Sequence, residues 1–153
     1  MTEKEIRTIM APLTEGHVML PGSAVAEVLN FTSPQPLKKA PAWLLGELAW
    51  RGWQVPIISF ERLMKPSVVK TTASRARILI IKTLGESTQV NYIGLVIQGL
   101  PRLRKVSPTT LVEKSTDELP DTVFSRVSIE DLHAVIPRLG KLTRAVERAA
   151  YNS

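Results

Sequence analysis

The sequence predicts an all-β chain that forms two small barrels and ends in one α-helix. Short apolar runs alternate with breaks at the 8 glycines and 11 prolines of the 153 residues, which is typical of short strands joined by tight connections. The apolar pattern also repeats weakly after 72 residues. Only the C-terminal segment shows the spacing of an amphipathic helix.

The first half of the chain shows a series of short apolar runs separated by turn residues. Strands are predicted at 6–10, 17–20, 24–31, 48–50 and 54–58, and one helical turn at 60–64. Thr14-Glu15-Gly16 and Gly52 mark turns between strands. The polar segment 65–74 is expected to be a mobile connector between two sets of strands.

The second half begins with four consecutive apolar residues, 78–81, between Arg77 and Lys82. Such a run is typical of a strand that is buried on both faces. Further strands are predicted at 90–97, 100–106, 122–129 and 132–136, with a turn at 84–89 and an acidic loop at 116–121.

The end of the chain is predicted to be helical. Its apolar stripe, at steps of 3, 4 and 3, consists of Leu139, Leu142, Val146 and Ala149. Lys141, Arg144 and Arg148 lie off that stripe. We interpret the segment as a terminal helix docked on the barrels with a solvated basic face. A basic contact with a membrane or nucleic acid is the alternative.

The repeat at an offset of 72 residues indicates two copies of one small barrel. It aligns Ile6 with Ile78, Ile9 with Ile81, Val18 with Val90 and Gly22 with Gly94, and continues through Val25, Val28 and Phe31. This period is too long for a solenoid repeat. We therefore expect one domain, with a first barrel at 14–72, a second at 73–137, strand 5–13 joining either, and a helix at 138–150.

Composition restricts the classes of function. The absence of cysteine excludes disulfides, thiol catalysis and cysteine-ligated zinc, and fits a reducing compartment. The N-terminus lacks the order of a signal peptide, and no apolar stretch approaches the ~20 residues that span a bilayer. A cytoplasmic protein without membrane insertion is expected. The net charge of +6 fits nucleic acid, an anionic membrane surface or an acidic protein partner, or solubility alone.

The sequence shows no convincing catalytic or metal-binding pattern. His17 and His133 each lack a second ligand at metal-binding spacing, so no metal or cofactor is expected. Ser128, Asp131 and His133 hold the residue types of a triad. We expect only a polar bend there, because residues at this spacing across a bend should point in different directions. No phosphate-binding glycine motif occurs, so no catalytic residue is assigned and an enzyme is not expected.

Three tryptophans lie close together in the sequence. Trp43, Trp50 and Trp53 fall within eleven residues, and Arg51 lies between two of them. Tryptophans beside basic residues can stack on the bases of single strands. They are also favoured in cores and protein interfaces. The core or protein-interface interpretation is preferred, and a small β-barrel that binds nucleic acid is kept as the alternative function.

The segment 41–60 resembles the signature of the CheW family. That family shows a glycine, then Asn-x-Arg-Gly, then a proline, and soon afterwards an Asp-Leu pair. Gly46, Arg51, Gly52 and Pro56 stand at matching positions, while Ala49, Ser59 and Phe60 replace the usual Asn, Asp and Leu. Residues 20–28 are similar to the family's Val-x-Glu-Ile stretch. Residues 94–100 are similar to its Gly-Leu-x-Val-Asp-x-Val stretch, with Gln98 in place of Asp.

The resemblance, over roughly residues 5–140, implies a fold of two five-stranded SH3-like barrels with a hydrophobic groove between them. It also implies a non-enzymatic adaptor without a cofactor. Such an adaptor binds the hairpin tip of a methyl-accepting chemoreceptor and the regulatory domain of a CheA-type histidine kinase, at membrane-bound receptor arrays. No nucleic acid is expected as a partner. The sequence of residues 49–53 is similar to that of the ChpC branch of the family, which is linked to type IV pilus twitching motility.

Eight positions of this sequence carry the implied site. The receptor-side candidates are Val25, Glu27, Val28, Gly46 and Arg51, and the structural motif positions are Gly52, Pro56 and Gly94. Gly46 is expected to be small because a partner backbone approaches it. Gly52 would allow a bend where a side chain would clash, and Pro56 would lie at an edge or bulge. Arg51 would bind a carboxylate or carbonyl groups of a partner, tie the two barrels together by an internal salt bridge, or do both.

Overall fold

The computed structural model describes residues 5–65, 75–83, 85, 89–107, 110–113 and 119–151. The predicted connector at 65–74 lies outside the described residues except for Lys65. The predicted turn at 84–89 and the acidic loop at 116–121 are described only in part. No helix within the described ranges is long and apolar enough to cross a membrane.

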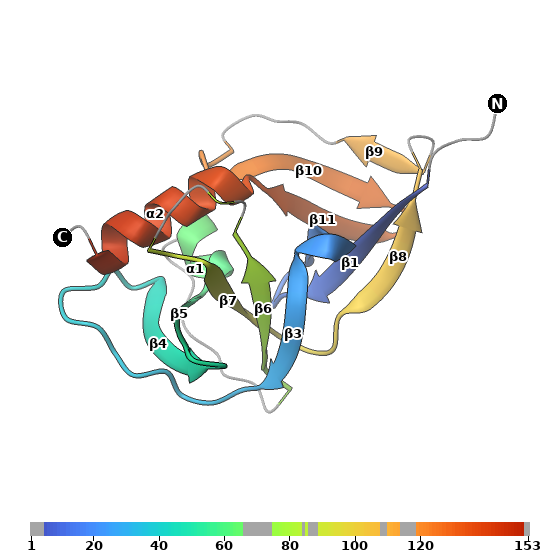
Figure 1. Ribbon diagram of the computed structural model, residues 1–153. Helices are drawn as coiled ribbons and strands as arrows, with labels where there is room; N and C mark the ends of the chain where they lie inside the picture. The colour runs from blue at the N-terminus through green and yellow to red at the C-terminus, as the bar shows by residue number, and fades with distance from the viewer. Residues whose placement is uncertain are drawn as a thin grey trace.

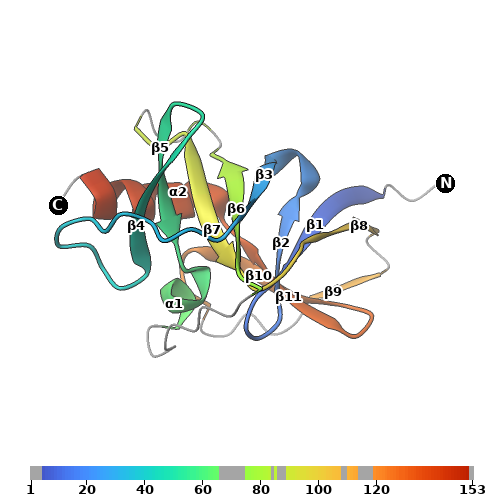
Figure 2. The ribbon, with the colours of Figure 1, turned by 90° about the horizontal axis from the view of Figure 1, so that it is seen from below.

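The strands form two sheets, and each sheet curves into a half-barrel (Figures 1 and 2). The five-stranded half-barrel has the order β3 (Val25–Asn30), β6 (Arg77–Lys82), β7 (Tyr92–Ile97), β5 (Trp53–Ile58) and β4 (Leu44–Trp50). The six-stranded half-barrel has the order β8 (Arg102–Val106), β1 (Ile6–Pro12), β2 (His17–Pro21), β11 (Leu132–Pro137), β10 (Val123–Ile129) and β9 (Leu111–Glu113). The predicted fold class is confirmed. The short strand β9 is additional to the predicted strands.

The allocation of strands to sheets differs from the predicted division at residues 72 and 73. β2 was expected in the first barrel, but it lies in the six-stranded half-barrel together with β1. β6 and β7 were expected in the second barrel, but they lie in the five-stranded one. The reason is a single 3₁₀ turn, η1 (Gly22–Ala24), which carries the chain from β2 into β3 of the other sheet. Each half-barrel therefore combines strands from both halves of the chain.

The 72-residue repeat nevertheless aligns strands that hold equivalent places in the two sheets. β1 and β2 form an antiparallel hairpin in which Ile9 pairs with Leu20. β6 and β7 form the same hairpin, in which Ile81 pairs with Ile93. The second strand of each hairpin then pairs in parallel with another strand, β2 with β11 and β7 with β5. The two half-barrels are thus copies in topology, assembled by exchange of one hairpin.

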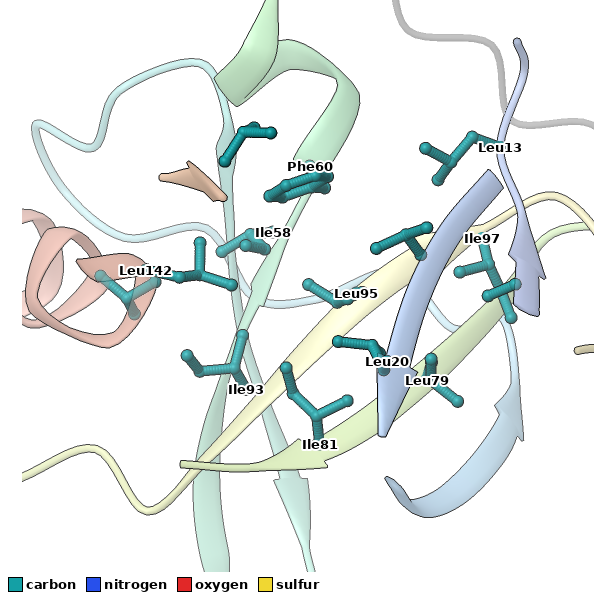
Figure 3. Packing of buried hydrophobic residues seen from close by; sticks show 14 of the residues in the cluster. Leu13, Leu20, Ile58, Phe60, Leu79, Ile81, Ile93, Leu95, Ile97 and Leu142 are labelled. Carbon is teal, nitrogen blue, oxygen red and sulfur yellow. The ribbon is translucent and has the colours of Figure 1, made fainter. Parts of the chain in front are cut away.

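Three hydrophobic cores hold this arrangement together. The central core lies between the sheets and includes Leu20, Ile58, Phe60, Leu95 and Leu142 (Figure 3). A second core fills the five-stranded half-barrel, and a third fills the six-stranded one. Each fully buried Leu or Ile side chain contributes roughly 1.5–3 kcal/mol. The central core therefore fixes the two half-barrels against each other.

β6 contributes to two of these cores. Ile78 and Ile80 belong to the core of the five-stranded half-barrel, whereas Leu79 and Ile81 belong to the central core. Successive side chains of a strand point to opposite faces. The prediction of a strand buried on both faces is confirmed.

Two helices complete the fold. The short α1 (Phe60–Met64) begins at Ser59, whose side chain accepts a hydrogen bond from the Arg62 N–H at 3.3 Å. The terminal α2 (Leu139–Tyr151) packs Leu142 and Val146 into the central core. Lys141, Arg144 and Arg148 are exposed, as the apolar stripe predicted. The C-terminal end of α2 lies beside β4, at the opposite end of the molecule from β8 (Figures 1 and 2).

Candidate partner-binding surface

Three of the five receptor-side candidates lie on β3, which is an edge strand of the five-stranded half-barrel. Val25, Glu27 and Val28 are all half-buried, and a bulge falls between Val25 and Glu27. Val25 and Val28 pack against the central core. The edge strand therefore offers one charged group and the outer parts of two valines to a partner.

Arg51 and Glu27 form an ion pair. The Nη2 atom of Arg51 donates to Oε1 of Glu27 at 2.6 Å. Arg51 lies in the β4–β5 turn, and β3 and β4 are the two edges of one sheet. The pair thus joins the two edges of one half-barrel. It does not tie the two barrels to each other, as the salt-bridge interpretation expected. The Arg51 side chain is 69% exposed and that of Glu27 is 31% exposed, so most of the guanidinium remains open to a partner.

The aromatic residues near Arg51 do not form one stacking platform. Trp50 is buried in the core of the five-stranded half-barrel, whereas Trp43 packs against the central core. Tyr92 contacts Trp50 and Trp53 edge to face, at centroid distances of 4.9 and 5.5 Å. The guanidinium of Arg51 lies 5.1 Å from the Trp50 ring centroid. Of the three tryptophans, only Trp53, 44% exposed, presents a large aromatic surface outward, which favours the core or protein-interface interpretation.

Position 46 requires glycine because another segment of the same chain packs against it. Gln35 and Glu47 exchange two backbone hydrogen bonds of 2.9 Å, which bring the Gln35 backbone against β4. A Cβ atom on Gly46 would collide with the Gln35 carbonyl, and the φ of Gly46 is +146°. The expectation that a partner backbone requires this glycine is therefore corrected. The approaching backbone belongs to the chain itself.

The turn glycine Gly52 also has a different reason from the one expected. Apart from its chain neighbours, no atom of the described residues lies within 4 Å of a Cβ built on Gly52, so a side chain would not clash. Its φ of +82°, next to a φ of +46° at Arg51, is the actual requirement. Two consecutive positive φ values are typical of a tight two-residue hairpin turn, in which glycine is favoured.

Pro56 and Gly94 both serve the interior of the five-stranded half-barrel. Pro56 was expected at an edge or a bulge, but it lies on the central strand β5, between β4 and β7, and pairs with Glu47, just beyond the bulge of β4. Parallel pairing of β5 with β7 begins one residue later, at Ile57, and the bulge of β4 lies opposite Ile57 and Ile58. A Cβ atom on Gly94 would collide with the side chains of Ile57 and Ile78. Packing therefore favours glycine at position 94, and Pro56 is buried.

A second ion pair, which the sequence analysis missed, repeats the first with the charges exchanged. Arg104 on the edge strand β8 pairs with Glu130 in the β10–β11 turn, at 3.6 Å. Glu130 has a φ of +54° and takes the place that Arg51 holds in the other half-barrel. Extending the 72-residue repeat would not have revealed the pair, because Glu27 and Arg104 are 77 residues apart and Arg51 and Glu130 are 79 apart, so the offset changes beyond the aligned strands.

A cleft of about 800 Å³ lies near this second pair, lined by residues of both sheets. Its lining contains four arginines, Arg75, Arg77, Arg102 and Arg104, together with apolar side chains such as Met10 and Leu132. The resemblance implied a hydrophobic groove. This cleft is strongly basic, and the hydrophobic groove stays a prediction.

The supposed triad residues lie on the β10–β11 hairpin. Ser128 and His133 are direct cross-strand partners, so the expectation that they point in different directions is wrong. Residues five apart face each other when the turn between them has two residues. Ser128 Oγ reaches the carbonyl oxygen of Glu130 at 3.4 Å. Among the described residues, no three His, Asp or Glu side chains gather in a way that could hold a metal ion.

Comparison with known proteins places this geometry in context. The profile of the family described as CheW, CheW-like domain, matches residues 7–147. The solved structure of the scaffolding protein TtCheW from Thermoanaerobacter tengcongensis is similar, with a TM-score of 0.74 and 17% sequence identity. The similarity covers 89% of this chain and 90% of that one, and at this identity it concerns the fold. No curated protein sequence matches the chain.

Proposed function

Because the chain belongs to the CheW-like domain family, we propose that it is a non-enzymatic adaptor that couples a methyl-accepting chemoreceptor to a CheA-type histidine kinase. The observation that carries this proposal is the family match over 7–147, together with the two half-barrels that realise it. The adaptor would act in the cytoplasm, next to membrane-bound receptor arrays.

The fold suits an adaptor that works by geometry. The central core packs side chains of both sheets and of α2 into one body. Close-packed interiors transmit displacement with little internal yielding. A partner bound to one half-barrel would therefore be held at a defined orientation to a partner bound to the other. No bond needs to be made or broken for receptor conformation to bias the kinase.

On the receptor side, we propose that the hairpin tip contacts β3 and the β4–β5 turn. Val25 and Val28 would give apolar contact at the sheet edge, and the Glu27–Arg51 pair would set register. Arg51 keeps donors free beyond the one used by Glu27, because a guanidinium carries five. Gly46 would act indirectly, by letting the Gln35 backbone pair with β4 beside this surface.

The test is a pull-down with a receptor cytoplasmic fragment and a CheA-type regulatory domain. Arg51→Asp should weaken capture of the partner that binds this face at least about tenfold, because it places a second carboxylate beside Glu27. Lys38→Asp, an exposed site with the same charge change, is the control and should bind like the wild-type chain. Circular dichroism of both variants should be unchanged. Normal binding by Arg51→Asp would refute this receptor face, and a wild-type chain that captures neither partner would refute the adaptor.

The same pull-down can distinguish a role in chemotaxis from a role in twitching motility. The sequence of residues 49–53, Ala-Trp-Arg-Gly-Trp, supports the branch that serves type IV pilus twitching motility. Regulatory domains from a chemotaxis kinase and from a twitching-motility kinase can be offered in competition. The proposed branch predicts preferential capture of the twitching-motility domain.

A further inference from the structure

We propose that the basic cleft between the two sheets binds an acidic, partly apolar segment of a partner protein. This inference rests on the proposed function and deepens it, because it states the chemistry of a segment that the adaptor would hold. Neither Glu27 nor Arg51 lines the cleft; their ion pair lies between an edge strand and a hairpin turn of the five-stranded half-barrel.

The two sheets each supply arginines to the cleft. Arg102 and Arg104 lie two residues apart on the edge strand β8 and pair directly with Met10 and Thr8 of β1. Side chains two apart on a strand share a face, so both point toward the concave side that buries Met10. Arg77 begins β6 of the other sheet, and Arg75 precedes it. Arginines from two separate sheets therefore meet around one space.

The positive charge of the cleft is poorly balanced from within. Aspartate and glutamate are absent from the described lining of the cleft. Glu130 reaches Arg104 at 3.6 Å, but its side chain is largely exposed. Arg77 is fixed by donating to the carbonyl oxygens of Arg75 and Ala76, at 3.2 and 3.1 Å. Within the described part of the chain, Arg75 and Arg102 have no ion-pair partner. Carboxylates are the complementary group for such guanidinium forks.

His17, one of the lining residues, has a buried polar atom without a hydrogen-bond partner among the described residues. The Nδ1 atom of His17 is buried and makes no hydrogen bond to any described residue. Buried polar atoms are nearly always paired in folded proteins, so an orphan atom calls for an explanation. Because this atom is sealed from solvent and His17 also lines a neighbouring pocket, it marks a polar spot in the lining but does not identify what the cleft binds.

The apolar lining favours a protein over nucleic acid or a membrane. Met10, Leu132 and Leu100 line the same space as the arginines, and Leu100 is 68% exposed. A carboxylate-bearing amphipathic segment matches both groups at once. Among the described lining residues there is no Trp, Tyr or Phe on which a base could stack. The space is concave, whereas a flat lipid surface requires a protruding or flat face.

The experiment uses the full chain and three synthetic amphipathic peptides of equal length. The peptides share their leucine positions, and their polar positions are all Glu, all Gln or all Lys. Fluorescence anisotropy at low salt measures each affinity, with a labelled oligothymidylate as a fourth probe. The test variant is Arg75→Glu/Arg102→Glu. The control is Lys38→Glu/Arg148→Glu, which makes the same change in net charge at exposed sites outside the cleft lining.

The Glu peptide should bind the wild-type chain at least tenfold more tightly than the Gln peptide. Binding should be lost in the test variant, kept in the control, and shifted in the test variant toward the Lys peptide. Three results would overturn the inference: equal binding of Glu and Gln peptides, no binding of the Glu peptide, or oligothymidylate bound as tightly and lost in the same variant. The proposed adaptor function is judged separately by the wild-type pull-down, so the two can fail independently.

Discussion

Each half-barrel has an ion pair between an edge strand and a hairpin turn, but the acidic and basic residues are exchanged between the two. In the five-stranded half-barrel, the edge strand carries the acid Glu27 and the hairpin turn carries the base Arg51. In the six-stranded half-barrel, the edge strand carries the base Arg104 and the turn carries the acid Glu130. Both turn residues have positive φ values, +46° and +54°. The backbone is thus repeated, while the side-chain chemistry is exchanged.

The surroundings of the two pairs differ more than their geometry. Arg51 lies against Trp50 and near the half-exposed Trp53, and its contact with Glu27 is short, at 2.6 Å. Arg104 faces a cleft with three further arginines, and its contact with Glu130 is 3.6 Å. The comparison teaches that one scaffold can present a balanced aromatic surface on one half and an unbalanced basic surface on the other. Two chemically different partners could thereby be held by related geometry.

The largest difference between the halves should appear at the bulges of β4 and β10. The bulge of β4 lies between Leu44 and Gly46, and that of β10 lies between Val123 and Ser125. Gly46→Ser should lower the free energy of unfolding by about 3 kcal/mol, because it adds overpacking against the Gln35 carbonyl to strain at positive φ. Ser125→Gly should cost only about 1 kcal/mol, mainly from backbone entropy.

Urea denaturation of both variants measures these losses. A similar loss at both positions would show that the Gln35 backbone does not impose the glycine. Gly46→Ala gives an intermediate check, since it tests the collision and the backbone strain without adding a hydroxyl.

A smaller difference is expected between the two ion pairs. Arg51→Met and Arg104→Met each remove one base while keeping a long apolar stem. Each should cost less than about 1 kcal/mol, because exposed ion pairs contribute little in water. Arg51→Met should cost more, since its contact is shorter and its guanidinium also lies over Trp50. Chemical denaturation at low and high salt separates the charge contribution. A larger loss for Arg104→Met would reverse the ranking.

The smallest effect concerns the attachment of α2 to the five-stranded half-barrel. The Tyr151 hydroxyl donates to Oε2 of Glu47 on β4 at 3.2 Å. Desolvation, followed by the Glu47 charge and this hydrogen bond, raises the pKa of Tyr151 to about 12, from 10.0. A raised pKa in the folded state means that the stabilisation is complete below pH 10 and is lost as pH rises toward about 12.

Tyr151→Phe should therefore flatten the dependence of stability on pH above 10 while changing stability at pH 7 by less than about 1 kcal/mol. Ultraviolet titration of the folded wild-type chain, compared with that of Tyr151→Phe, gives the pKa of Tyr151, because the chain has a second tyrosine at Tyr92. A Tyr151 pKa near 10.0 would contradict a hydrogen bond between Tyr151 and Glu47 in solution. Lys141→Met is the control at the other end of α2, where Lys141 pairs with Asp121 at 3.7 Å. It should leave the pKa of Tyr151 unchanged.

Much of the fold could be predicted because local sequence carries it. The apolar run at 78–81, the turn signals at Gly16 and Gly52, and the stripe of the terminal helix each depend on neighbours within a few residues. β9 escaped prediction because its three residues, Leu111–Glu113, are too few to show a period. The sequence pattern also pointed to the Glu27–Arg51 region, although the internal pairing of these two residues was not foreseen.

The sequence by itself determined where strands and turns form, the repeat of the strand pattern, and the family resemblance. Periodicity, glycine at positive φ and proline placement act through the chain's own neighbours. Only the tertiary structure decided which strands share a sheet, because the hairpins are exchanged through the turn at Gly22–Ala24. It also decided why position 46 requires glycine and that two pairs of arginines, far apart in the chain, meet in one cleft. These features depend on contacts between residues far apart in the chain, which no local pattern records.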